Sequence, residues 1–152
     1  MNEGRSQAGI GSIETFIFVC IVSALTLVML PSYLGYSRHK QATVLADNFR
    51  SYASAFRDYA TEIGDWPSTA EPGAIPPEMH GRLPLHFTQG SIGESQWAWE
   101  AQTRWARAGI SLLAAGLDKD IILELDGILD DGNPETGAMV SSGNRVTLLL
   151  GK

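Results

Sequence analysis

The apolar residues of this chain are concentrated near its N-terminus. Residues 16–30 are apolar except for Ser23 and Thr26, whereas polar and charged residues are interspersed through the rest of the chain. As an α-helix, residues 10–30 would span roughly 30 Å, about the thickness of the hydrocarbon core of a bilayer. The pattern therefore predicts one membrane-spanning helix followed by a soluble region.

An amphipathic helix is predicted directly after the apolar segment. Apolar residues recur there at intervals of three and four positions, which places them on one face of a helix. Gly64 and Pro67 follow this pattern and are typical of a helix end. We expect the apolar face to pack against the protein's own soluble region. The residues of this face are Leu45, Phe49, Tyr52, Phe56, Tyr59 and Ile63.

The remaining residues predict a long loop and a small antiparallel sheet. Residues 65–93 are dense in Pro and Gly, which indicates a connection with one short turn near residues 77–81. The expected fold class is α+β, with a long N-terminal helix packed on a small antiparallel sheet. The other predicted elements are strands at 96–100 and 104–113, a helix capped by Asp118 that ends near Leu129, and a hairpin formed by 138–141 and 145–150.

Composition and charge exclude some functions. The net charge is −6, with 17 acidic and 11 basic residues, so a general affinity for nucleic acid is not expected. Cys20 is the single cysteine, so no disulfide can form within the chain. The sequence contains no Gly-x-Ser-x-Gly, His-Glu-x-x-His or phosphate-binding loop motif, and an enzyme is not expected.

The spacing of a few residues at the N-terminus is more specific than the apolar pattern. Glu14 is the one charged residue within residues 10–30, and an unpaired carboxylate at the bilayer centre costs about 2.5 kcal/mol or more. Gly9 and Ile10 precede it, and Pro31 and Tyr33 follow the apolar segment. Together these residues resemble the processing signal of type IV prepilins and pseudopilins. In that family a leader ends in Gly, and Glu is the fifth residue of the mature chain.

The resemblance implies a processing and assembly mechanism. Residues 1–9 correspond to a leader that a prepilin peptidase removes between Gly9 and Ile10, methylating the new amine of Ile10. In the filament, Glu14 pairs with the N-terminal amine of a neighbouring subunit, which sets the register of the subunits. Pro31 removes one backbone donor and is expected to kink or locally melt the helix.

The same resemblance implies a domain order and a set of partners. Residues 10–34 form the membrane and polymerisation half of the helix, 35–64 its amphipathic half, and 65–152 the soluble loop and sheet. The expected location is the inner membrane, crossed once, with the soluble part in the periplasm. The expected partners are other copies of the chain in a filament, other pseudopilins, the prepilin peptidase and an inner-membrane assembly platform.

A type II secretion pseudopilin that supports protein export is the leading interpretation. A surface pilin for adhesion or motility shares the N-terminal signal and stays open as an alternative. A membrane-anchored binding module that does not polymerise is a second alternative. Trp97, Trp99 and Trp105 could form the binding platform of such a module, although we favour packing for these residues.

One loop of the soluble region has the composition of a calcium site. Asp130, Asp131 and Asn133 supply oxygen ligands in a Gly-containing segment, as calcium prefers. The resemblance adds weight, because major pseudopilins bind calcium in a C-terminal loop. The spacing is not that of an EF-hand, however, and Asp, Asn and Gly are also common turn formers. Calcium is therefore a candidate cofactor, with an ordinary turn as the alternative.

Overall fold

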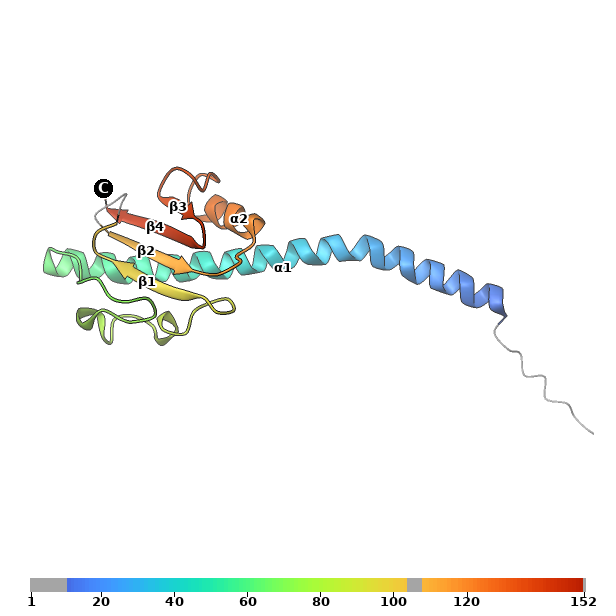
Figure 1. Cartoon of the computed structure of the whole chain (residues 1–152), viewed down its shortest axis with the longest axis horizontal. Coiled ribbons are helices and arrows are strands. Elements are labelled where there is room, and N and C mark those ends of the chain that lie inside the picture. The colour runs from blue at the N-terminus through green and yellow to red at the C-terminus, as the bar shows by residue number, and fades with distance from the viewer. Residues whose placement is uncertain (1–10, 104–107, 152) are drawn as a thin grey trace, which may run out of the picture. The chain divides into compact units, whose positions relative to one another are not determined.

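The computed structural model describes residues 11–103 and 108–151, with only the backbone described at position 31. It is an α+β structure in which a long helix, α1 (Ser12–Ile63), is followed by a four-stranded antiparallel sheet (Figure 1). The predicted fold class is confirmed. The chain divides into two compact units, Met1–Ser37 and Arg38–Lys152, and α1 contributes residues to both.

The described part of the first unit is helical from Ser12 onward and apolar. Its described side chains between positions 11 and 36 are all exposed. By length and composition α1 is a candidate membrane-spanning helix. Its most apolar stretch, near the N-terminus, is not buried by other described parts of the chain. The hydroxyl of Thr26 donates to the carbonyl of Val22 at 2.8 Å, so this polar group is satisfied within the helix.

Helix α1 continues through position 31 without a break. The local melting expected at Pro31 is therefore not observed, whereas a kink there stays a prediction. At its other end α1 stops at Ile63, and Gly64 adopts a φ of 86° that favours glycine. The predicted helix end at Gly64 is confirmed.

The sheet lies in the second unit and has the order β1-β2-β4-β3. All its pairings are antiparallel. The predicted strand at residues 96–100 and the C-terminal hairpin are confirmed to within one residue at each end, whereas residues 104–107 of the second predicted strand lie outside the described residues. The strands are β1 (Gln96–Glu100), β2 (Ala108–Leu113), β3 (Met139–Ser142) and β4 (Arg145–Gly151).

The long connection between α1 and β1 contains two short 3₁₀ turns. The first, η1 (Pro77–Met79), lies where a turn was predicted, and the second, η2 (Leu85–Phe87), was not predicted. Met79 and Phe87 are buried in the core, so both turns carry an apolar side chain inward. The connection is therefore part of the packed unit.

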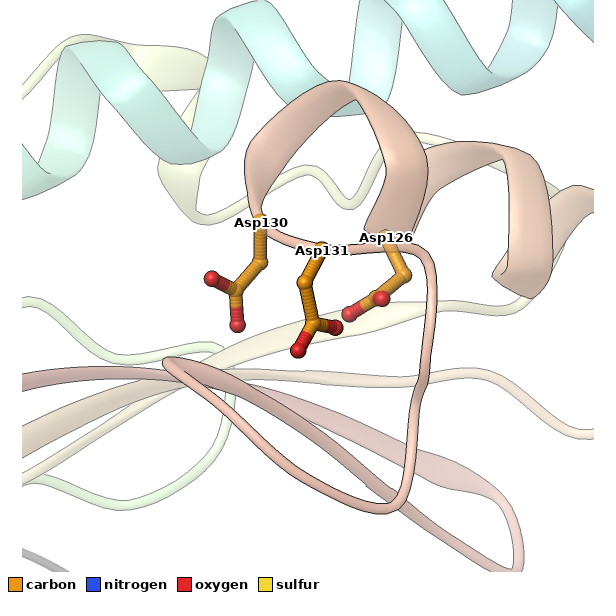
Figure 2. A group of neighbouring side chains, drawn as sticks. All are labelled: Asp126, Asp130 and Asp131. Atoms are coloured by element: carbon orange, nitrogen blue, oxygen red, sulfur yellow. The ribbon is translucent and has the colours of Figure 1, made fainter.

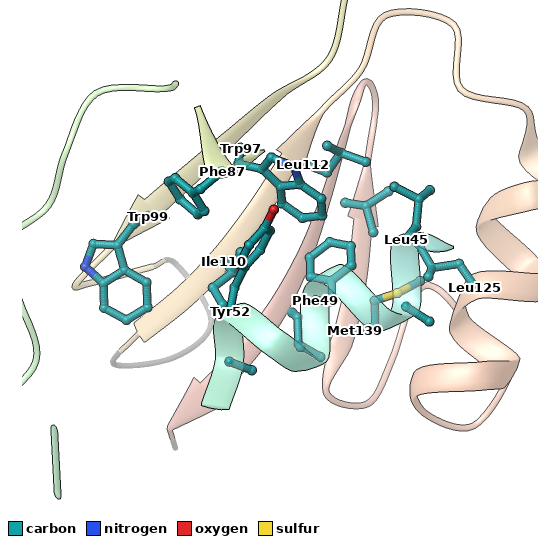
Figure 3. Packing of buried hydrophobic residues seen from close by; sticks show 14 of the residues in the cluster. Leu45, Phe49, Tyr52, Phe87, Trp97, Trp99, Ile110, Leu112, Leu125 and Met139 are labelled. Atoms are coloured by element: carbon teal, nitrogen blue, oxygen red, sulfur yellow. The ribbon is translucent and has the colours of Figure 1, made fainter. Parts of the chain in front are cut away.

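The core of the second unit joins α1 to the sheet through aromatic side chains (Figure 3). Phe49 packs edge-on against Trp97, with ring centroids 4.8 Å apart. Trp97 and Trp99 are fully buried, so the predicted packing role is confirmed for both, while Trp105 lies outside the described residues. The predicted apolar face of α1 is confirmed except at Ile63, the last residue of the helix, which is 56% exposed.

A second helix, α2 (Lys119–Leu129), is held at both ends by side chains of α1. Its N-cap is Asp118, as predicted, and the Asp118 carboxylate accepts from the backbone N–H of Asp120 at 3.0 Å. Arg38 pairs with Asp118 at 3.2 Å and with Asp120 at 2.7 Å. At the other end, Arg50 donates to the carbonyl of Ile128 at 2.8 Å. These contacts fix where α2 ends and the following loop begins.

Candidate functional site

Glu14 occupies a defined position in the first turn of α1. The first helical residue is Ser12, so Gly11 is the N-cap and Glu14 is the third helical residue. The Glu14 carboxylate accepts a hydrogen bond from the backbone N–H of Gly11 at 3.1 Å. This is one half of a capping box, in which an acid at the third position satisfies the N-cap donor.

Apart from this hydrogen bond, Glu14 is exposed and makes no ion pair with another described residue. The expected processing residues Gly9 and Ile10 lie outside the described residues. The side chain of Pro31 is likewise not described. The cleavage, methylation and inter-subunit pairing implied by the family resemblance therefore stay predictions.

A second candidate site lies at the C-terminal end of α2 (Figure 2). Asp126 comes from the last turn of α2, Asp130 is its C-cap residue, and Asp131 begins the following loop. One carboxylate oxygen of each of these residues lies within 4.8 Å of the others. We call these three residues the aspartate cluster.

Asp126 is the unusual member of the cluster, because its side chain is fully buried while Asp130 and Asp131 are exposed. Both Asp126 carboxylate oxygens lack a hydrogen-bond partner. Burial raises the pKa of Asp126, and the charges of Asp130 and Asp131 raise it further. The backbone N–H groups of Gly132 and Asn133 offset this pKa rise in part, but neither meets the geometry of a hydrogen bond to the carboxylate.

Asp130 is oriented by backbone donors from across the loop. One of its carboxylate oxygens accepts from the backbone N–H of Ala138 and from that of Met139, the latter at 3.2 Å. Gly137 makes this approach possible, because a Cβ at that position would lie only 1.9 Å from the same oxygen. Asp130 thus ties the end of α2 to the start of β3.

The loop after α2 is shaped by its own side chains. Asp131 accepts from the backbone N–H of Asn133 at 2.9 Å, and the side-chain oxygen of Asn133 accepts from the backbone N–H of Glu135 at 3.3 Å. Two successive turns of this kind are what the turn alternative predicts. Asn133, a predicted calcium ligand, therefore has a role in the loop itself, and the structure leaves its role as a ligand untested.

Asp126 was not among the predicted site residues. Two signals in the sequence pointed to it: Asp126 follows the apolar residue Ile122 by four positions and precedes Asp130 by four. The first spacing places Asp126 on the inward face of α2, and the second juxtaposes two like charges, which destabilises a helix. A buried acid facing another acid one turn away requires a compensating partner.

The chain was compared with models of protein families, with curated proteins and with solved structures, and no match was found in any of the three.

Proposed function

We propose that this chain is a structural subunit of a type IV pilin-like filament, held in the membrane by the first half of α1, and that it is most similar to a type II secretion pseudopilin. The observation that carries the proposal is an exposed apolar helix half that bears a single acid, Glu14, in its first turn. In this role the chain performs no catalysis.

The exposed apolar side chains support membrane insertion and lateral packing. Phe16 is 69% exposed, Leu27 72% and Val28 73%, so these side chains are not covered by the described part of their own chain. A bilayer covers such a surface before assembly, and the equivalent helices of other subunits cover it afterwards. Both environments are apolar, so a subunit can move from one to the other without exposing this surface to water.

Glu14 supplies the positional signal in this proposal. Among the residues that the structure describes, its carboxylate accepts one hydrogen bond, from the backbone N–H of Gly11, and forms no ion pair. In a bundle of apolar helices, a positive N-terminal amine of a neighbouring subunit provides the compensation, and a subunit out of register leaves both charges unpaired. The pair therefore favours a single axial position for each new subunit.

Two substitutions at Glu14 separate the charge from the helix cap. Glu14→Gln keeps a side-chain acceptor at the third helical position and preserves the bond to Gly11, whereas Glu14→Ala removes both acceptor and charge. We expect both variants to insert in the membrane and neither to enter filaments, as measured by sedimentation of sheared filaments and electron microscopy. Thr26→Ala, which removes a polar group satisfied within the helix, is the matched control and should assemble.

The N-terminus of the protein from native membranes provides a direct test of processing. The expected mass is that of a chain starting at a methylated Ile10. An unprocessed chain in cells with an active prepilin peptidase would contradict the proposal and favour an anchored binding module. Filaments found outside the cell, with normal protein export after deletion of the gene, would favour a surface pilin instead.

A further inference from the structure

Trp66 differs from the other tryptophans that the structure describes. Its side chain is partly exposed, whereas Trp97 and Trp99 are fully buried. The indole N–H groups of Trp97 and Trp99 donate to Ser91 and Pro67, but the indole N–H of Trp66 has no acceptor among the described residues. Trp66 therefore presents both an aromatic surface and an unused hydrogen-bond donor to the solvent.

The position of Trp66 is fixed by contacts on both sides in the sequence. The carboxylate of Asp65 accepts from the backbone N–H of Trp66 at 2.8 Å. Pro67, the next residue, is buried, and its carbonyl accepts from the indole of Trp99 at 3.2 Å. The Trp66 ring also packs against that of Trp99, with centroids 5.6 Å apart. A ligand that binds a side chain already held in place loses less free energy to ordering the site.

Two hollows in the surface of the second unit meet at this side chain. Their volumes are about 390 and 370 Å³, and Asp65 and Trp66 line both of them. Gln102 lines the first hollow, and Arg57 lines the second. Each volume lies within the range of about 300–1,000 Å³ that is typical of small-molecule sites. Because the hollows share two residues, one elongated ligand can occupy both.

The polar groups of the two hollows are exposed and unused. Arg57 and Asp65 line the same hollow with opposite charges, yet neither forms an ion pair with a described residue. The side-chain amide of Gln102 has no hydrogen bond within the described part of the chain. These groups offer donors and acceptors together, and their charges cancel. They therefore favour a neutral ligand with many hydroxyl groups.

A sugar combines the two properties that this surface matches. One face of a sugar ring is formed by C–H groups and can pack on an indole, while the hydroxyl groups at its rim both donate and accept. A protein partner would instead require an apolar centre around the aromatic anchor. The residues that share the hollows with Trp66 include the charged Arg57 and Asp65 and the amide Gln102, so a sugar fits better.

We propose that Trp66, Asp65, Gln102 and Arg57 form a binding site for a neutral oligosaccharide, with one sugar unit in each hollow and Trp66 between them. Asp65 and Arg57 bind hydroxyl groups in the second hollow, and Gln102 binds those in the first. The site goes beyond the proposed filament function, because it gives the soluble part of the subunit a contact with a polysaccharide.

The test uses the full chain, labelled with ¹⁵N, in micelles of a detergent that has no sugar head group. Cellotetraose, chitotetraose and maltotetraose are added separately, up to roughly 10 mM, which is tenfold above a dissociation constant of about 1 mM. At least one of them should shift the indole N–H resonance of Trp66 in a saturable manner. The resonances of Trp97 and Trp99 should shift less, because their N–H groups are bound within the core.

Variants at the aromatic and acidic positions test the two kinds of contact. Trp66→Ala identifies the resonance and should weaken binding about tenfold or more, measured by calorimetry. Asp65→Asn keeps an acceptor for the backbone N–H of Trp66 but removes the charge, so it should weaken binding about threefold to tenfold. Unchanged resonances of Trp97 and Trp99 show that each variant is folded.

A matched pair of glutamines provides the control. Gln102→Ala should weaken binding about threefold to tenfold, because it removes an amide from the first hollow. Gln89→Ala removes the same group from an exposed position that lines neither hollow, so its affinity should be unchanged. If Trp66→Ala fails to fold, Asp65→Asn and the glutamine pair still decide the matter, since Asp65 and Gln102 are exposed.

Three results would overturn the proposal. These are the absence of a saturable shift with all three tetrasaccharides, full affinity in Trp66→Ala, and equal weakening in Gln89→Ala and Gln102→Ala. A protein that binds at Trp66 while no tetrasaccharide does would identify a protein interface instead. None of these measurements depends on filament assembly, so failure of the sugar site and failure of the filament function are distinguishable.

Discussion

The rings of Phe56 and Trp99 stack face to face, with centroids 3.7 Å apart and an angle of 6° between their planes. Phe56 belongs to α1 and Trp99 to β1, so the contact joins the helix to the edge of the sheet. The indole N–H of Trp99 also donates to the carbonyl of Pro67 at 3.2 Å, which ties the start of the long connection to the same place.

Replacing Phe56 should therefore destabilise the second unit strongly. Phe56→Ala removes a fully buried ring and leaves a cavity, for which the expected loss is about 3–5 kcal/mol in the free energy of unfolding. Chemical denaturation of the full chain in micelles, monitored by tryptophan fluorescence, measures this loss. Ile63→Ala, on the same helix at a 56% exposed position, should change stability by less than about 0.5 kcal/mol. Equal effects of the two variants would refute the proposed core contact.

The buried hydroxyl of Tyr52 lowers the free energy of unfolding of the second unit. Its oxygen is buried and has no hydrogen-bond partner, while its ring packs edge-on against Phe87 and Trp97. Tyr52→Phe keeps the ring contacts and removes the unsatisfied group, so we expect a gain of about 1 kcal/mol in the free energy of unfolding. A loss of similar size would indicate that the hydroxyl has a partner in solution.

The same residue predicts how stability changes at high pH. Burial raises the pKa of Tyr52 from 10.0 to about 12. Between these values the unfolded chain loses the phenol proton while the folded chain keeps it, so the free energy of unfolding is unaffected by this group below pH 10 and falls as the pH rises toward 12. The unfolding temperatures of the unmodified chain and of Tyr52→Phe should diverge above pH 10. A constant difference would show that Tyr52 ionises normally in the folded state.

Two glycines near the aspartate cluster should respond in opposite ways to alanine. Gly137 has a φ of 89°, and a Cβ there would clash with Asp130, so Gly137→Ala should destabilise by about 1–3 kcal/mol. Gly127 lies within α2 with open space around it, so Gly127→Ala should stabilise by about 0.5–1 kcal/mol. Thermal unfolding of both variants measures these effects, and destabilisation by Gly127→Ala would contradict the helical, open environment of Gly127.

The second unit should fold without the apolar half of α1. Among the described residues, all the fully buried apolar side chains lie in the second unit, Arg38–Lys152. A chain that begins at residue 38 should therefore be soluble, should unfold cooperatively and should show a single, native-like near-ultraviolet circular dichroism spectrum. A chain that begins at residue 50 lacks four fully buried residues of α1, namely Ala42, Leu45, Ala46 and Phe49, and should not fold. Folding of the shorter chain would show that this part of α1 is not needed by the core.

Several elements of the second unit were predictable because their signals are local. The three- and four-residue spacing of Leu45, Phe49 and Tyr52 identified the buried face of α1, and Gly64 marked its end. Asp118 marked the start of α2 because an N-cap acid satisfies a donor only two residues away. Such interactions depend on neighbours in the chain, so they can be read without knowledge of the fold.

The aspartate cluster was only partly predictable. The composition of the loop pointed to Asp130 and Asp131, but it also favoured Asn133, which participates in a turn, and it missed Asp126. The burial of Asp126 depends on the packing of the folded chain around α2, which local spacing does not describe.

The sequence by itself determined the apolar segment with its single acid, which is a candidate membrane span, the amphipathic continuation of the helix and the α+β class, since these follow from local spacing and composition. Only the tertiary structure decided the strand order, the inward placement of Phe87 and the burial of Asp126. The physical reason is that burial depends on which surfaces meet, and these surfaces are brought together by contacts between residues far apart in the chain.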